Sequence, residues 1–155
     1  MTDTIESRLA ARNIVLPEAA APAANYLPYV ITGNLLFISG QLPMENGAIA
    51  VKGLLGRDVD VATGQRAAEL CAINILAQAK AALGGDLKRI VRVVKLSGFV
   101  ASEPSFTDQH LVINGASNLI ADLLGEPGKH ARAAVGMACL PLNASVEIDA
   151  VIEIG

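Results

Sequence analysis

Apolar residues recur at helical spacing in two long segments of the chain and at strand-like spacing between them. Residues 61–83 are rich in alanine, carry leucine or isoleucine every three to four positions, and run into Gly84-Gly85, which predicts a helix with a glycine stop. Residues 105–124 predict a second helix that ends at a glycine. Residues 4–12 have a shorter stretch of the same spacing, which predicts a short N-terminal helix.

Runs of β-branched and alternating apolar residues predict the strands. The strand segments are residues 29–32, 35–39, 44–51, 89–101, 130–141 and 146–154. Turn signals at Gly33-Asn34 and Asn46-Gly47 make hairpins of the first segments. Residues 89–101 predict a central strand, and a short turn at residues 141–144 joins the last two strands.

The order of these elements predicts the fold class. Helices and strands do not alternate strictly, which is typical of an α+β domain with a mixed sheet and both main helices packed on one face. The strand at residues 89–101 does not alternate cleanly, so the other face of the sheet also needs a cover, which association of subunits would supply. Residues 17–28, rich in alanine and proline, predict an irregular, extended lead-in. At 155 residues the chain makes one domain.

Composition narrows the class of protein further. Hydrophobic residues make up 52% of the chain and charged residues 17%, which favours burial of apolar surface between subunits. The net charge is −3 and aromatic residues are 3%, so the chain offers neither a basic face nor stacking aromatics for nucleic acid. No apolar stretch reaches the roughly 18 residues that cross a bilayer, and residues 1–12 lack a signal-peptide pattern. We expect a cytoplasmic protein that binds neither nucleic acid nor membrane.

The cysteines and histidines do not predict a metal site or a disulfide. Cys71 and Cys139 lie far apart in apolar runs, so we expect two buried, free thiols, with Cys139 structural rather than catalytic. His110 and His130 have no accompanying cluster of ligands. We interpret His110 as a surface or packing residue of the second helix.

The C-terminal third carries the strongest candidate chemistry. Arg132 stands at the start of one predicted strand; Glu147 and Asp149 lie on the next and face one side, because they are two residues apart. A guanidinium offers a planar fork of donors that matches a carboxylate, and Glu147, if it lies beside Arg132, could hold and polarise a water. The alternatives are a surface arginine at a strand end and an outward-facing glutamate.

Other motifs carry weaker signals. The segment SGQLP at residues 39–43 ends a strand, and its glycine would let a ligand approach backbone N–H groups; a simple strand exit is the alternative. We interpret Asp58 and Asp60 as residues that begin the first long helix. The chain has no glycine-rich phosphate loop, and neither Ser117 nor another serine has the sequence context of a nucleophile elbow.

Several of these features occur together in the order and spacing of a known family. They are Pro28-Tyr29-Val30, SGQLP at residues 39–43, Ala131-Arg132, Leu140-Pro141 and VEIDA at residues 146–150. In this combination the chain resembles the YjgF/RidA family from about residue 26 to residue 154. We therefore expect an N-terminal extension with a short helix at residues 1–25 and a RidA-like domain at residues 26–155.

The resemblance implies a fold, an assembly and a reaction. The fold is a chorismate-mutase-like α+β domain, which assembles as a homotrimer with a cleft between each pair of subunits. The reaction is hydrolysis of reactive 2-enamine and 2-imine carboxylates, such as 2-iminobutanoate and 2-iminopropanoate, to 2-keto acids and ammonia. It uses no cofactor, and its partners are a small carboxylate-bearing metabolite and other copies of the chain.

The resemblance also implies roles for individual residues. Arg132 matches the arginine that grips the substrate carboxylate, and Glu147 matches the glutamate that positions the attacking water. The positions that match residues of the substrate cleft are Tyr29, Ser39, Gly40 and Asn114.

Departures from the family pattern keep a second function open. Ala133-Ala134 replaces the usual pair that includes a cysteine, and residues 125–130 form a longer connection without the usual aromatic. These changes indicate a divergent subgroup, and they leave a non-catalytic trimer that binds small carboxylates as the alternative to a deaminase. An endoribonuclease fits poorly, because the chain is acidic and has no catalytic pair of histidines in its pattern.

Overall fold

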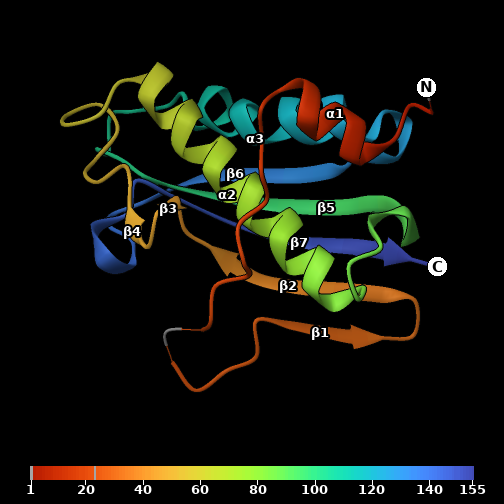
Figure 1. Ribbon diagram of the computed structural model, residues 1–155. Coiled ribbons are helices and arrows are strands. Elements are labelled where there is room, and N and C mark those ends of the chain that lie inside the picture. Colours follow the sequence, from red (N-terminus) through yellow and green to blue (C-terminus); the bar gives the residue numbers. More distant parts are fainter. Residues whose placement is uncertain (1, 23) are drawn as a thin grey trace.

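The computed structural model describes residues 2–22 and 24–155, and its central feature is a five-stranded sheet with helices on one face (Figure 1). The helices are α1 (Ile5–Ala11), α2 (Val61–Ala82) and α3 (Gln109–Leu124). The strands are β1 (Tyr29–Thr32), β2 (Leu35–Gln41), β3 (Met44–Glu45), β4 (Ala48–Ile49), β5 (Ile90–Ala101), β6 (Ala131–Met137) and β7 (Val146–Ile154). The predicted α+β class and the placement of both main helices on one face are confirmed.

The order of the strands decides which residues can meet. The main sheet runs β1-β2-β7-β5-β6, and β3 and β4 form a separate small hairpin. The β5–β6 pair is parallel and the other pairs are antiparallel, which confirms a mixed sheet with β5 inside it. Because β5 lies between β6 and β7, the last two strands are consecutive in sequence but are not neighbours in the sheet.

The beginnings of the two long helices differ from the sequence interpretation in detail. Asp60 caps α2 by accepting a hydrogen bond from the backbone N–H of Thr63 at 2.8 Å, as predicted. Asp58 does not begin the helix: its carboxylate accepts from the N–H of Leu54 at 2.9 Å and closes the preceding turn. The second helix begins at Gln109, later than predicted, because the residues before it form a separate turn closed by the Phe106 N–H on the carbonyl of Glu103.

The core lies between the sheet and the two long helices. Along β7 every second residue is buried, from Val146 and Ile148 onward, and every residue between them is half-exposed. Glu147 and Asp149 therefore share the face that points away from the helices, as the spacing predicted. Burial of each large aliphatic side chain in this core contributes about 1.5–3 kcal/mol.

The face of the sheet opposite the helices is open in the single chain. Large apolar side chains on it, among them Phe37 of β2 and Val135 of β6, each keep 42% of their surface exposed. Val91 and Val94 of β5 are also exposed. Such a face needs a cover in water, which is the condition that led us to expect association of subunits.

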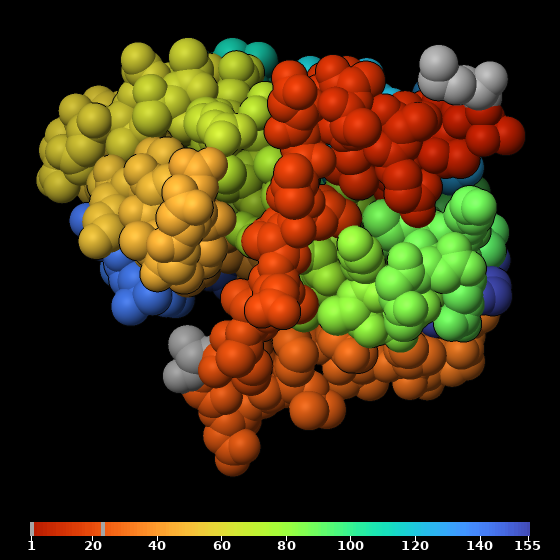
Figure 2. Space-filling view, in the orientation of Figure 1, coloured from red at the N-terminus to blue at the C-terminus, as the bar shows by residue number. Residues whose placement is uncertain are grey.

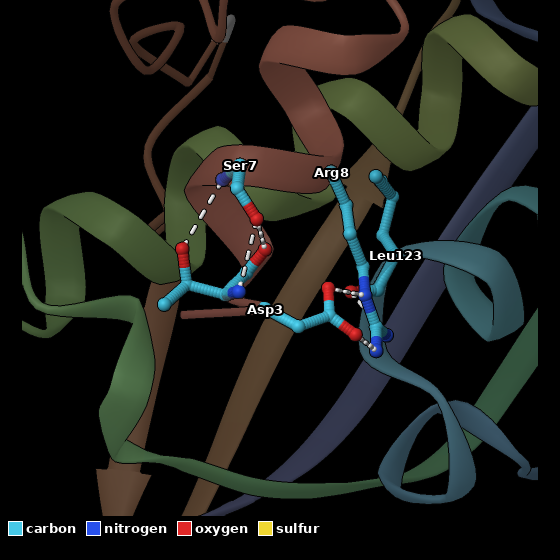
Figure 3. Close-up of polar contacts among 5 residues, drawn as sticks. Asp3, Ser7, Arg8 and Leu123 are labelled. Atoms are coloured by element: carbon cyan, nitrogen blue, oxygen red, sulfur yellow. Dashed lines mark hydrogen bonds and ion pairs between the residues drawn. The ribbon is translucent and has the colours of Figure 1, made fainter. Parts of the chain in front are cut away.

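The N-terminal segment is attached to the domain by α1. Ile5 and Leu9 are buried, and Arg8 pairs with the carboxylate of Asp3 at 2.7 Å and donates to the carbonyl of Leu123 in α3 at 3.3 Å (Figure 3). From α1 the chain crosses over α2 to reach β1 (Figures 1 and 2), and the side chain of Gln78 donates to Ala20 at 2.8 Å. The predicted lead-in is irregular in its described part; residue 23 lies outside the described residues.

The two cysteines have different environments. Cys71 in α2 is fully buried and Cys139 is exposed, and both are free thiols. The expectation that both are buried is wrong for Cys139, because β6 ends at Met137 and the chain then leaves the sheet. In the part of the chain that the structure describes, none of the helices combines the length and the apolar composition needed to cross a membrane.

Candidate functional site

Arg132 is held in place by helix α3. Its Nη1 donates to the hydroxyl of Ser117 at 3.0 Å, and its Nη2 donates to the backbone carbonyl of His110 at 3.1 Å. A guanidinium has five N–H donors, so these two bonds leave donors for a ligand. Both Nη atoms are bonded to a neighbouring element, so the head group has a defined position at the protein surface.

Ser117 is itself bonded to a histidine. The hydroxyl of Ser117 lies 2.9 Å from Nε2 of His130, and Nδ1 of His130 lies 2.6 Å from the carbonyl of Gly128. The sequence interpretation left Ser117 and His130 out of the site. One signal was available for His130, which stands two residues before Arg132, whereas Ser117 is brought to Arg132 only by the packing of α3 on β6.

Asn114 lies on the same stripe of α3. His110, Asn114 and Ser117 are spaced by four and three residues, which places them on one side of the helix. Because Arg132 bonds to the first and last of these residues, Asn114 occupies the turn between its two anchors. We call Arg132, Asn114, Ser117 and His130 the Arg132 cluster.

Glu147 lies on the opposite side of the sheet, beside a glycine. The carboxylate occupies the space that a side chain at position 40 would need, since a Cβ on Gly40 would lie 2.2 Å from Glu147 Oε1. Glu147 is half-buried, and its pKa is raised, first by loss of solvent around the carboxylate and then by the nearby charge of Asp149. A side chain at position 40 would therefore displace the carboxylate of Glu147 from its place.

The other two predicted cleft residues lie in the β1–β2 hairpin. The hydroxyl of Ser39 donates to the carbonyl of Leu27 at 2.7 Å, so this side chain fastens the lead-in to β2. Tyr29 is paired with Ile38 and packs partly against the core. We call Glu147, Gly40 and Ser39 the Glu147 cluster, because β2 pairs directly with β7. Tyr29 lies in β1, and its pairing with the buried Ile38 places it on the helix-covered face, away from Glu147.

Within one chain the two clusters lie on opposite faces of the sheet. Arg132 pairs with Leu96 of β5, which is fully buried on the helix side. Glu147 pairs with Phe99, three residues further along β5, and an odd spacing along a strand reverses the face. The condition that Glu147 lies beside Arg132 is therefore not met inside a single chain, because β5 lies between their strands and the register turns the two side chains to opposite faces.

Two hollows of the described chain lie away from Arg132 and Glu147. A hollow of about 630 Å³ separates the N-terminal segment from the β3–β4 hairpin (Figure 2), and a smaller one of about 120 Å³ lies beside Gly40. Arg132 and Glu147 line neither of these two cavities. Among residues 2–22 and 24–155, no cluster of three or more His, Cys, Asp or Glu side chains has the arrangement of a metal site.

Comparison with known families places this geometry in a class. The YjgF/chorismate mutase-like family, whose description also carries an endoribonuclease label, matches residues 6–154. Protein TCP17 of Trypanosoma cruzi is 50% identical over 151 residues, covering 97% of this chain and 94% of that protein. The RutC family protein y4sK of Sinorhizobium fredii is 32% identical over 138 residues, covering 89% and 91%. The chain belongs to the YjgF/RidA family.

Solved structures agree with this assignment. Atu1372 from Agrobacterium tumefaciens, a protein of unknown function, is 71% identical with a TM-score of 0.93, covering 97% of this chain and 92% of that one. RidA from an Antarctic Psychrobacter is 31% identical with a TM-score of 0.62, covering 88% and 94%. TdcF of E. coli with bound serine is 25% identical with a TM-score of 0.60, covering 90% and 93%. The predicted chorismate-mutase-like fold is confirmed.

Proposed function

We propose that this protein hydrolyses reactive 2-enamine and 2-imine carboxylates to 2-keto acids and ammonia. The observation that carries the proposal is the anchored guanidinium of Arg132, with donors left over for a carboxylate. Charge-assisted hydrogen bonds of this kind contribute about 1.5–3 kcal/mol each. They orient a small acid whose reacting carbon is directly attached to the carboxylate.

The chemistry needs little more than orientation and a water. The oxygen of water adds to the imine carbon, the nitrogen takes up protons, and the carbon–nitrogen bond breaks to release ammonia and leave a carbonyl. An enamine first takes a proton on carbon and becomes the imine. In this scheme Glu147 receives a proton from the attacking water, a role that its raised pKa supports and that is worth about 10²–10⁴-fold in rate. The scheme uses no cofactor.

We further propose that the site is completed by a second copy of the chain. Arg132 and Glu147 lie on opposite faces of one sheet, so a cleft that holds both draws Arg132 from one subunit and Glu147 from its neighbour. The apolar side chains beside Glu147, Phe99 in the adjacent strand and Val135 beyond it, favour a subunit contact on that face. A homotrimer with three such clefts is the assembly that we propose.

The remaining residues of the two clusters supply the walls of the cleft. In the proposed assembly Asn114 stands beside Arg132, and Ser39 and Gly40 stand beside Glu147. The role of Tyr29 in the cleft wall rests on the family resemblance alone. The absence of a side chain at Gly40 lets the carboxylate of Glu147 lie directly against the backbone there. Since reactive imines are released by pyridoxal-phosphate enzymes of amino-acid metabolism, we place the protein in the cytoplasm.

One observation favours a second candidate function. Arg132 is anchored by α3 without any contribution from Glu147, so the Arg132 cluster can bind a small carboxylate in the absence of hydrolysis. TdcF, which shares the fold, has been crystallised with bound serine, a small carboxylate. A non-catalytic trimer that binds such metabolites is therefore the alternative.

A coupled assay tests the proposal. An amino-acid oxidase or a serine/threonine dehydratase generates the imine, and the release of 2-keto acid is followed. The proteins compared are wild type, Arg132→Ala and Arg132→Lys. Arg89→Ala, at an exposed arginine directly before β5, is the matched control. We expect acceleration by wild type and Arg89→Ala, a loss of at least tenfold in Arg132→Ala, and incomplete activity in Arg132→Lys, since lysine lacks the planar fork.

The outcomes separate the two functions. No acceleration by wild type with several amino acids would contradict the deaminase. Binding of 2-ketobutyrate that Arg132→Ala abolishes, measured by calorimetry in the absence of turnover, would then support the carboxylate-binding alternative.

A further inference from the structure

We propose that His130 and Ser117 form a relay that positions the guanidinium of Arg132 for its ligand. The relay consists of three consecutive contacts: Arg132 Nη1 to Ser117 Oγ at 3.0 Å, Ser117 Oγ to His130 Nε2 at 2.9 Å, and His130 Nδ1 to the carbonyl of Gly128 at 2.6 Å. The inference rests on the proposed function for the identity of the ligand. The relay itself is defined by the contacts of one chain.

For a neutral His130, the direction of each hydrogen bond follows from the chemistry of its groups. A guanidinium can only donate, so the hydroxyl oxygen of Ser117 accepts from Arg132. A backbone carbonyl can only accept, so His130 donates from Nδ1 to Gly128. In a neutral imidazole with its proton on Nδ1, Nε2 is an acceptor and takes the hydroxyl proton of Ser117. The relay then runs in one direction, and each bond polarises the next.

The far end of the relay is rigidly placed. Gly128 ends the short 3-10 turn Glu126–Gly128 and is buried. A Cβ at this position would lie 2.5 Å from the carbonyl oxygen of Ile120, so the turn is seated directly against the backbone of α3. His130 therefore bonds to a fixed acceptor, and its imidazole in turn fixes the position of the Ser117 hydroxyl.

The relay meets a specific need of a long, flexible side chain. A flexible arginine side chain loses rotamer entropy when it binds an anion. An arginine that is already held in its binding conformation loses less. The carbonyl of His110 holds one Nη atom and Ser117 holds the other, so the plane of the guanidinium is set before a carboxylate arrives. His130 acts through Ser117 and is a positioning residue rather than a catalytic one.

The state of the relay is read by NMR on the folded protein without substrate. In wild type, ¹⁵N shifts of the neutral imidazole of His130 should show the proton on Nδ1 rather than on Nε2. With ¹⁵N-arginine labelling, rotation of the Arg132 guanidinium should be slow in wild type, faster in Ser117→Ala, and restored in Ser117→Thr, which keeps the hydroxyl. Asn118→Ala, at the exposed neighbour of Ser117, is the matched control.

The imidazole end has its own pair of variants. We expect faster rotation of the Arg132 guanidinium in His130→Ala and partial restoration in His130→Gln, whose amide oxygen can accept from Ser117. An Nε2-protonated tautomer of His130, or a guanidinium that rotates at the wild-type rate in both Ser117→Ala and His130→Ala, would overturn the relay. Because two different residues are varied, a folding defect in one variant leaves the test intact.

Kinetics give the second readout and separate this inference from the proposed function. If the protein is a deaminase, Ser117→Ala should raise KM about tenfold with kcat within about twofold, the effect of losing one charge-assisted bond that acts on binding. Ser117→Thr should restore KM. Turnover with an unchanged KM in Ser117→Ala overturns the relay, whereas a wild type without turnover overturns only the deaminase and leaves the NMR test standing.

Discussion

Glu147 shows how the surroundings of one side chain set its chemistry. The carboxylate is half-buried between two strands, lies against Gly40, and shares its face with Asp149 two residues away. Loss of solvent and the neighbouring negative charge both favour the protonated form, so the pKa is raised above its ordinary value. A carboxylate with a raised pKa is a better proton acceptor for water when it is ionised.

Replacement of Glu147 by glutamine should make stability depend less on pH. Since the pKa of Glu147 is higher in the folded than in the unfolded chain, the folded state binds more protons in the window between the two values. Wild-type stability therefore falls as pH rises through that window, and Glu147→Gln should be more stable than wild type above it.

Urea unfolding of the two proteins from pH 4 to pH 8 measures this difference in stability. Glu153→Gln, on the same strand and face, is the control. A gap between Glu147→Gln and wild type that shrinks with rising pH would contradict the prediction.

The packing of α2 against α3 depends on the small residues of both helices. The backbones of α2 and α3 lie close together at Gly115, where a Cβ would lie 2.3 Å from the carbonyl oxygen of Gln65 in α2. The side chain of Gln65 in turn donates to the carbonyl of Leu111 at 2.9 Å. This contact positions α3 over the sheet and thereby places Ser117 over Arg132.

Introduction of a methyl group at Gly115 should therefore destabilise the fold. Replacement of a helical glycine by alanine ordinarily stabilises a helix by about 0.8–1 kcal/mol, but here the added Cβ meets backbone rather than a flexible side chain. We expect Gly115→Ala to lower the free energy of unfolding by about 1–3 kcal/mol.

Chemical unfolding compared with Asn118→Ala, an exposed position of the same helix, measures the effect. A higher free energy of unfolding for Gly115→Ala would contradict the close contact between α2 and α3 at this position.

The sheet as a whole separates the Arg132 cluster from the Glu147 cluster. Its helix-covered face holds the core and Arg132, and its open face carries Glu147 with exposed apolar side chains such as Phe37 and Val135. The active site that we propose needs both residues, so it would draw Arg132 from one copy of the chain and Glu147 from another. The open face and the divided site therefore have one common explanation, the proposed trimer.

A charged side chain on the open face should both separate the subunits and reduce the rate of imine hydrolysis. We expect Val135→Asp and Phe37→Asp to shift the mass measured by light scattering from trimer toward monomer, and to reduce imine hydrolysis at least tenfold, because an unpaired carboxylate cannot be buried in an apolar contact.

Val15→Asp is the control, since Val15 is 88% exposed on the N-terminal segment. A wild-type protein that is monomeric at micromolar concentration would contradict the assembly.

Local signals in the chain were sufficient for the elements themselves. The alanine-rich period, the cap at Asp60 and the turns at Gly33-Asn34 and Asn46-Gly47 act over a few residues, so both long helices and the hairpins were predictable. The alternation in β7 likewise placed Glu147 and Asp149 on one face. The order of motifs was enough to identify the family and to predict Arg132 and Glu147 as candidate site residues.

What local signals could not supply are relations between distant segments. That β5 would separate β6 from β7, and that the register would place Arg132 and Glu147 on opposite faces, depends on strand pairing across the whole domain. That Ser117 and His130 would anchor Arg132 depends on how α3 packs on β6. The spacing of residues specifies elements because their forces are short-ranged along the chain, whereas a site built between elements exists only once those elements are packed.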